Sequence, residues 1–107
     1  MYNVANVIQV KKGFADQVVE KFEKRGEVLG FAGFLGIEVM VTEQNKDYED
    51  VTILTRWDSK ENFTNWVKSD VFKKVHTKEN IRPDFILGNK VVKYKVKLSK
   101  QPESIAN

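Results

Sequence analysis

Residues 62–76 read Asn-Phe-Thr-Asn-Trp-Val-Lys-Ser-Asp-Val-Phe-Lys-Lys-Val-His, and they include the only histidine of the chain and one of its two tryptophans. An apolar residue recurs at every fourth position, which predicts an amphipathic helix with its apolar stripe toward the core. The stripe consists of Phe63, Val67, Val71 and Val75. Trp66 and His76 project to the two sides of this stripe, so we expect that neither is needed to hold the helix on the core.

A break is expected in the middle of this stretch. Ser69 or Asp70 can cap a second helix that begins near Val71. In that second helix Phe72 and His76 are i,i+4 neighbours on one face, so an aromatic ring stands beside the imidazole. The simplest interpretation of a lone histidine at a helix end is a surface residue near the negative end of the helix dipole.

The metal chemistry open to this histidine is narrow. The sequence has one histidine and no cysteine, so one chain cannot build a tetrahedral zinc site from the usual nitrogen and sulfur ligands. One imidazole can still bind the iron of a haem, because the porphyrin supplies the equatorial nitrogens. We therefore expect no zinc and retain haem as a possible ligand.

The first strand carries a polar residue on its apolar face. Its inward positions alternate regularly and are Tyr2, Val4, Ile8 and Val10. Asn6 lies in the middle of the same face, where an amide without partners costs about 1–3 kcal/mol. Asn6 is therefore either bonded to an adjacent strand or serves as a polar donor in an apolar ligand pocket.

The order of elements predicts the fold. We expect strands at about residues 2–10, 35–42, 51–57 and 86–98, and helices at about residues 14–25 and in the stretch quoted above. This order, β-α-β-β-α-β, is the ferredoxin-like pattern of an α+β protein. Apolar residues such as Ala5 and Val7 also occur on the face that the helices leave bare, which suggests that two subunits pack sheet to sheet.

Two details of this fold are predicted from single residues. Trp57, at the end of the third strand, is expected to pack in the core, and Ser59 or Asp58 is expected to cap the helix that follows. Residues 77–88 are expected to form a loop, because they include Pro83 and Gly88.

Composition limits the class of protein. With 107 residues, the chain is expected to form one domain, residues 1–107, with an irregular tail from about residue 99. The net charge is +3, and Lys93, Lys95 and Lys97 alternate along the last strand as on the solvated face of an edge strand. We expect no nucleic-acid partner, no membrane span and a cytoplasmic location.

The chain resembles a known family. Residues 65–76 resemble the corresponding helix of the IsdG-family haem-degrading monooxygenases, residues 51–60 resemble the third strand and helix entry of that family, and residues 89–92 with Tyr94 resemble its last strand. The resemblance extends over nearly the whole chain up to about Lys97. It implies a homodimer that forms a dimeric α+β barrel, with a haem pocket between helices and sheet in each subunit.

The resemblance also implies roles for individual residues. His76 is expected to bind the haem iron on the proximal side through an unprotonated Nε2, so haem affinity should fall below about pH 6. Asn6 is expected on the distal side, over the oxygen-binding position, and Trp66 is expected to press on the porphyrin and distort it. Phe22 and Phe72 are expected to line the pocket, although core packing is the simpler assignment for Phe22.

The implied reaction is oxidative haem degradation. Haem is both substrate and cofactor, O2 is the oxidant, an external reductant supplies electrons, and no flavin or zinc is expected in the chain. Two alternatives remain open: a haem carrier that does not degrade its ligand, and a cofactor-independent monooxygenase of the same fold. Residues 77–85 are shorter than the corresponding family loop, so the contacts of the haem propionates are not predicted.

Overall fold

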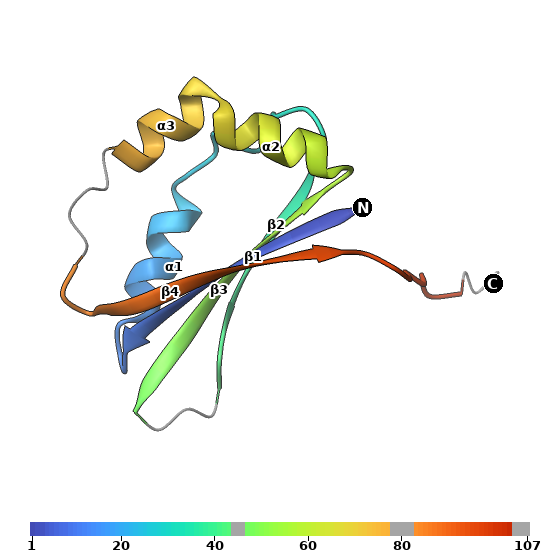
Figure 1. Cartoon of the computed structure of the whole chain (residues 1–107). Coiled ribbons are helices and arrows are strands. Elements are labelled where there is room, and N and C mark those ends of the chain that lie inside the picture. Colours follow the sequence, from blue (N-terminus) through green and yellow to red (C-terminus); the bar gives the residue numbers. More distant parts are fainter. Residues whose placement is uncertain (44–46, 78–82, 104–107) are drawn as a thin grey trace.

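The computed structural model describes residues 1–43, 47–77 and 83–103, and the side chains of these residues except 75–77. Its elements in chain order are β1 (Tyr2–Lys11), α1 (Ala15–Glu23), β2 (Phe34–Val41), β3 (Tyr48–Trp57), α2 (Lys60–Lys68), α3 (Asp70–Thr77) and β4 (Ile86–Lys95). The strands form one antiparallel sheet in the order β2-β3-β1-β4 (Figure 1). The predicted ferredoxin-like subunit is therefore confirmed.

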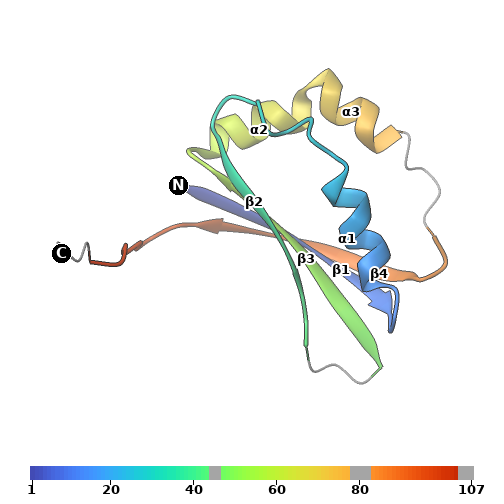
Figure 2. The same ribbon diagram turned by 180° about the vertical axis from the view of Figure 1, so that it is seen from behind.

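The helices all lie on one face of the sheet. Figure 1 and Figure 2 show α1 along the sheet and α2 with α3 across one end, while the opposite face carries no helix in the described parts of the chain. Strands β2 and β4 are the two edges. None of the described helices is long and apolar enough to cross a membrane.

Two separate apolar clusters fill the space between helices and sheet. The cluster beneath α1 consists of Ile8, Val10, Ala15, Val18, Val51 and Ile53. The cluster beneath α2 has Tyr2, Val4 and Trp57 at its centre, and the partly buried side chains packed around them are Val28, Phe31, Phe34, Phe63 and Trp66. Trp57 is fully buried, so its predicted core position is confirmed.

Serine caps define both helices after β3. The Asn62 N–H donates to Ser59 Oγ over 3.2 Å at the start of α2, and the Phe72 N–H donates to Ser69 Oγ over 3.2 Å at the start of α3. Each bond satisfies an amide that has no partner within its helix. The predicted break is therefore confirmed, but the apolar stripe does not continue across it, because Val71 is 42% exposed.

The observed ends of β3 and β4 differ from the predicted ones. Both strands extend for as long as they find pairing partners on β1, and local sequence signals do not show that length. β3 begins at Tyr48, which pairs with Lys11, three residues before the predicted start. β4 contains Gly88, which was expected in the loop, and ends at Lys95, which pairs with Tyr2, the first residue of β1. One further backbone bond follows, from the Val96 N–H to the Met1 carbonyl over 3.1 Å, where the chain reaches its first residue. Residues 78–82 of the predicted loop and 104–107 of the predicted tail lie outside the described residues.

A bulge changes the face of the first residues of β2. Phe34 pairs with Trp57 and Gly36 pairs with Arg56, so Leu35 is an extra residue between them. Phe34 therefore packs in the cluster beneath α2, whereas Leu35 is 49% exposed. Strict alternation along the strand predicted at residues 35–42 would place Leu35 on the same face as Ile37 and Val39, and the bulge removes it from that face.

The connector between α1 and β2 is tied to the start of α2. The Asp58 N–H donates to the Gly33 carbonyl over 2.9 Å, and Asn62 Nδ2 donates to Asp58 Oδ1 over 2.8 Å. Gly33 has a φ of +83°, and a Cβ there would overlap the side chains of Asp58 and Asn62. Gly33 is therefore required both for its backbone conformation and for its lack of a side chain.

We predict that Gly33→Ala lowers the free energy of unfolding by about 3 kcal/mol, because it combines a left-handed backbone with steric overlap. Gly13→Ala is the matched control, since Gly13 has a φ of +92° but open space around it. Its expected loss is about 1–2 kcal/mol. Urea unfolding of both variants measures the difference. Equal losses would mean that the contacts with Asp58 and Asn62 do not restrict Gly33.

Candidate functional site

Asn6 lies on the helix-facing side of the sheet, at the boundary between the two apolar clusters. Along β1 it stands between Val4, which belongs to the cluster beneath α2, and Ile8, which belongs to the cluster beneath α1. Its cross-strand neighbours are Ile53 on β3 and Val91 on β4. Val91 is 53% exposed although it faces the helical layer, so this part of the sheet is not covered by packing.

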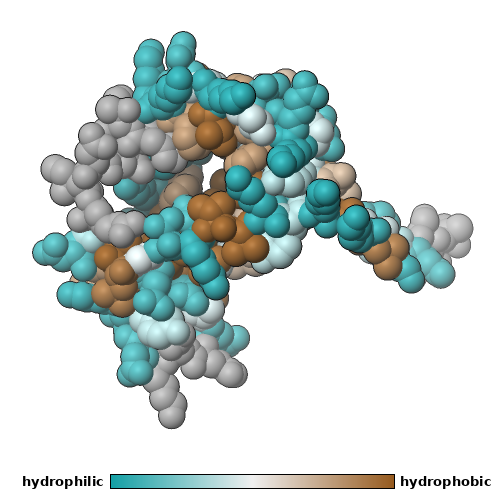
Figure 3. Space-filling view, in the orientation of Figure 1, coloured by the Kyte–Doolittle hydropathy of each residue, from teal (hydrophilic) through white to brown (hydrophobic). Residues whose placement is uncertain are grey.

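The surface is hollowed on the helix-facing side of the sheet. Figure 3 shows an opening between the α2–α3 helices and the sheet edge formed by β4, and apolar residues border it on both sides. Apolar hollows with a few polar groups are typical of sites that bind organic ligands. The predicted position of Asn6 on the inward face of β1 is confirmed.

Asn6 is bonded to the adjacent strand. Asn89 Nδ2 donates a hydrogen bond to Asn6 Oδ1 over 3.1 Å. This bond satisfies the amide oxygen of Asn6, and no partner for its Nδ2 is found within residues 1–43, 47–77 and 83–103. The structural and the ligand-binding interpretations of Asn6 are therefore compatible, because each uses a different atom of the amide.

Trp66 is part of the aromatic packing beneath α2. Its ring centroid lies 5.2 Å from that of Phe31, 6.5 Å from that of Trp57 and 5.6 Å from that of Phe72. Three rings from three different segments therefore fix its orientation. The expectation that Trp66 is not needed to hold the helix on the core is wrong, because the connector that carries Phe31 folds against α2.

The described part of α3 extends the aromatic packing by one ring. The Phe72 ring meets Trp66 edge-on, at an interplanar angle of 84°. The backbone of His76 lies in the same helix, four residues later, as predicted. The imidazole itself is outside the described side chains, so its contact with iron and its position beside Phe72 stay predictions.

Phe22 packs against the cluster beneath α1, which agrees with the simpler of its two assignments. The Arg25 guanidinium carbon lies 5.0 Å from the centre of the Phe22 ring. Burial lowers the pKa of Arg25, and the nearby charge of Glu27 opposes that effect. A contact between Phe22 and a ligand stays a prediction.

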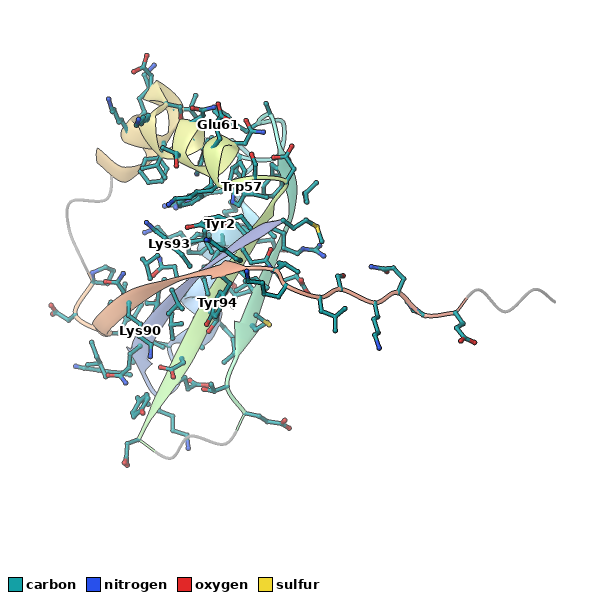
Figure 4. The ribbon with its side chains drawn as sticks, turned by 45° about the vertical axis from the view of Figure 1, so that its right-hand side comes forward. Tyr2, Trp57, Glu61, Lys90, Lys93 and Tyr94 are labelled. Atoms are coloured by element: carbon teal, nitrogen blue, oxygen red, sulfur yellow. The ribbon has the colours of Figure 1, made fainter. Side chains whose placement is uncertain are left out.

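Lys93 is a residue that the sequence pattern did not associate with the site. The register pairs Lys93 with Val4 and Lys95 with Tyr2, so both lysines lie on the helix-facing side of β4. Lys93 Nζ lies 5.8 Å from the centre of the Phe63 ring. Figure 4 shows Lys93 on the same side of the sheet as Tyr2 and Trp57, with Tyr94 on the other side. The alternation was visible in the sequence, but its direction required the register.

These elements suit a flat apolar ligand that carries acidic groups. The helix-facing side of β1 supplies the amide of Asn6, the packing beneath α2 supplies an aromatic surface, and the edge strand β4 supplies the ammonium group of Lys93. Throughout the described side chains, no three His, Cys, Asp or Glu residues lie close enough to hold a metal ion.

Comparisons with known proteins agree with this description. The sequence profile of the family described as "Antibiotic biosynthesis monooxygenase" matches residues 1–78. A Bacillus mycoides (strain KBAB4) protein named heme-degrading monooxygenase is 42% identical over 106 residues, covering 99% of this chain and 99% of that protein. A Halalkalibacterium halodurans protein of the same name is 42% identical over 106 residues, covering 99% of this chain and 90% of that protein.

Solved structures share the fold. A Bacillus cereus protein described as an antibiotic biosynthesis monooxygenase has a TM-score of 0.81 and 31% identity, over 94% of this chain and 97% of that chain. The heme-degrader MhuD of Mycobacterium tuberculosis, with two hemes bound in its active site, has a TM-score of 0.70 and 21% identity, over 94% of this chain and 100% of that chain. SnoaB, a cofactor-independent oxygenase from Streptomyces nogalater, has a TM-score of 0.67 and 12% identity, over 92% of this chain and 94% of that chain.

The fold alone does not distinguish these activities, because proteins described as a heme degrader and as a cofactor-independent oxygenase both share it. The sequence relationship is more specific, since it extends over nearly the full length of this chain. The chain therefore belongs to the antibiotic biosynthesis monooxygenase family, and its full-length relatives at 42% identity are named heme-degrading monooxygenases.

Proposed function

We propose that this chain is a haem-degrading monooxygenase that opens the porphyrin ring and releases iron, with O2 as oxidant and electrons from an external reductant. The observation that carries the proposal is the 42% identity, over 99% of the chain, to proteins named for this activity. Residues 1–107 form the proposed catalytic domain. A cytoplasmic location, where reducing cofactors are available, fits the reaction.

Haem in this proposal is the substrate, and it also supplies the iron at which O2 is activated. The proposed role of His76 is to bind that iron through Nε2, which requires the neutral imidazole. Asn6 donates a hydrogen bond from Nδ2 to a ligand on the opposite side of the haem. A donor that is already oriented before the ligand arrives stabilises developing charge without reorganisation.

The proposed role of Trp66 is to press against the porphyrin plane. A side chain can deform a ligand only if it is held more rigidly than the ligand, and the contacts with Phe31, Trp57 and Phe72 support such rigidity. Phe22 and Phe72 complete the proposed lining. Lys93, over the edge of the same aromatic packing, is suited to pair with an acidic group of the ligand.

We also propose a homodimer through the face of the sheet that carries no helix. The register places Ala5 of β1 between Leu54 of β3 and Val92 of β4 on that face. Exposed apolar side chains continue the same face, since Met40 is 44% and Tyr94 is 50% exposed. Packing a second sheet on this surface removes apolar area from water and gives the dimeric α+β barrel.

The first experiment titrates the purified protein with hemin and then adds ascorbate or a flavin reductase in air. A saturable Soret band that decays with release of chelatable iron is the expected result. A Soret band that forms and persists would instead identify a haem carrier. Oxidation of an aromatic polyketide with no haem bound would identify a cofactor-independent monooxygenase.

We predict that substitutions separate binding from turnover. His76→Ala should abolish the histidine-ligated Soret spectrum together with turnover, because it removes the proposed iron ligand. Asn6→Ala should retain the spectrum and lose roughly 100-fold in turnover, the typical loss for one preorganised donor. Asn65→Ala, at an exposed asparagine of α2, is the matched control. Full turnover by His76→Ala would exclude this mechanism.

We predict that Trp66 contributes to folding as well as to turnover. Trp66→Ala should lower the free energy of unfolding of the haem-free protein by about 2 kcal/mol, roughly half the loss for a fully buried tryptophan, because Trp66 is partly buried. Trp66→Phe should keep most of that stability and bind haem, yet lose turnover. Urea unfolding and single-turnover absorption measure the two effects, with exposed Asn65→Ala as the control.

We predict that Tyr94→Glu weakens the dimer at least tenfold, because it places a charge in an apolar interface. Sedimentation velocity over a range of protein concentrations measures the effect. The control is Lys95→Glu, at the neighbouring position of β4 but on the helix-facing side. Equal dissociation of both variants, or a monomeric unmodified protein, would contradict the proposed interface.

A further inference from the structure

We infer that Asn89 is a positioning residue for the amide of Asn6. Its bond to Asn6 Oδ1 determines which end of that amide meets the ligand. The identity of the ligand rests on the proposed function, whereas the contact between the two asparagines belongs to the structure itself. Neither the sequence pattern nor the resemblance pointed to Asn89 as a site residue.

The two asparagines are diagonal neighbours on one face of the sheet. Asn89 pairs with Ile8, and Val91, two residues later on β4, pairs with Asn6. Side chains at such diagonal positions are within reach of each other when they are long enough. Asn89 Nδ2 and Asn6 Oδ1 are 3.1 Å apart, an ordinary length for an N–H···O hydrogen bond.

The backbone on the N-terminal side of Asn89 is held by two hydrogen bonds. The Lys11 N–H donates to the Phe85 carbonyl over 2.8 Å, and the Ile86 N–H donates to the Pro83 carbonyl over 3.0 Å. The first bond ties the residue before β4 to the end of β1, and the second closes the turn that leads into β4. The backbone that carries the donor of the asparagine pair is therefore held by the strand ladder and is in place before a ligand binds.

The chemistry of the amide explains why this orientation matters. An asparagine side chain presents an acceptor at Oδ1 and a donor at Nδ2, and a half-turn exchanges them. With Oδ1 occupied by Asn89, Nδ2 is the atom left to meet a ligand with excess negative charge. If Asn89 keeps its own orientation, the reversed amide of Asn6 would direct an oxygen lone pair at that ligand and two N–H groups at each other.

Asn89→Asp should reverse the orientation of the Asn6 amide, because it replaces the donor of the pair by an acceptor of almost the same shape. An ionised carboxylate only accepts hydrogen bonds, so the Asp side chain would bond Asn6 Nδ2 and turn Oδ1 toward the ligand. Asn89→Ala removes the partner and leaves the amide free to turn. The two variants therefore distinguish a reversed amide from a merely unrestrained one.

The test loads each variant with haem, reduces it, adds carbon monoxide and records the C–O stretching frequency by infrared spectroscopy. That frequency reports whether a donor or a lone pair faces the bound diatomic. We expect Asn89→Asp to raise it in the same direction as Asn6→Ala, and Asn89→Ala to raise it less. Turnover by Asn89→Asp should fall roughly tenfold, the change expected for one ordinary hydrogen bond, with haem affinity largely retained.

The same substitutions in an Asn6→Ala background provide the control for charge. If Asn89 acts through Asn6, Asn89→Asp should cause no further change in the frequency of the double variant. An equal shift in both backgrounds would show that the new carboxylate acts directly, and it would overturn the inference. Thermal unfolding of the haem-free variants checks that each one is folded.

The outcomes separate this inference from the proposed function. Unchanged frequency and turnover for Asn89→Asp, in a protein whose unmodified form degrades haem, would refute the role of Asn89 alone. If the unmodified protein binds haem without degrading it, the proposed function fails while the infrared comparison still tests Asn89. An unmodified protein that binds no haem would overturn both.

Discussion

The alternation of side chains along β1 is the constraint on which the rest of the structure depends. β1 is paired with β3 over its whole length and with β4 from Tyr2 to Val10, so the side chains of this central strand are each assigned to one face of the sheet. A shift of one residue would exchange the two faces and remove both apolar clusters at once. Because that register is strongly specified, Asn6 cannot turn away from the helical layer, and the fold holds a polar group at the boundary of its own core.

The aromatic packing beneath α2 shows how closely folding and site formation are connected. Trp57 is fully buried and donates from Nε1 to Thr55 Oγ1 over 3.0 Å, so it is fixed by packing and by a hydrogen bond. Trp66 stacks against it but is only partly buried. The cluster beneath α2 is therefore fully buried at Trp57 and partly exposed to solvent at Trp66. A ligand that binds against Trp66 contacts side chains whose positions are already determined by the fold.

The sequence predicted the fold because its signals were local. The alternation of the strands, the serine caps and the break near Ser69 each depend on a few neighbouring residues, and the structure has all three. Asn6 was identified for the same reason, as a polar residue in an otherwise apolar alternation. The roles assigned to Asn6, Trp66 and His76 came from the family resemblance and stay predictions.

The parts that the sequence did not predict depend on contacts between distant segments. The packing of Trp66 requires Phe31 of a connector that has no periodic pattern. The direction of Lys93 and the bond from Asn89 to Asn6 require the register of β4 against β1, which no local pattern specifies. The bulge at Leu35 is likewise visible only once β2 is aligned with β3.

The division of the interior into two apolar clusters has a consequence for the evolution of the sequence. Asn6, Asn89 and Lys93 belong to neither cluster, so substitutions at these three positions need not disturb the packing of either one. The size and polarity of the ligand space can then drift while the fold persists. This independence offers a physical reason why one architecture is shared by proteins described as a heme degrader and as a cofactor-independent oxygenase.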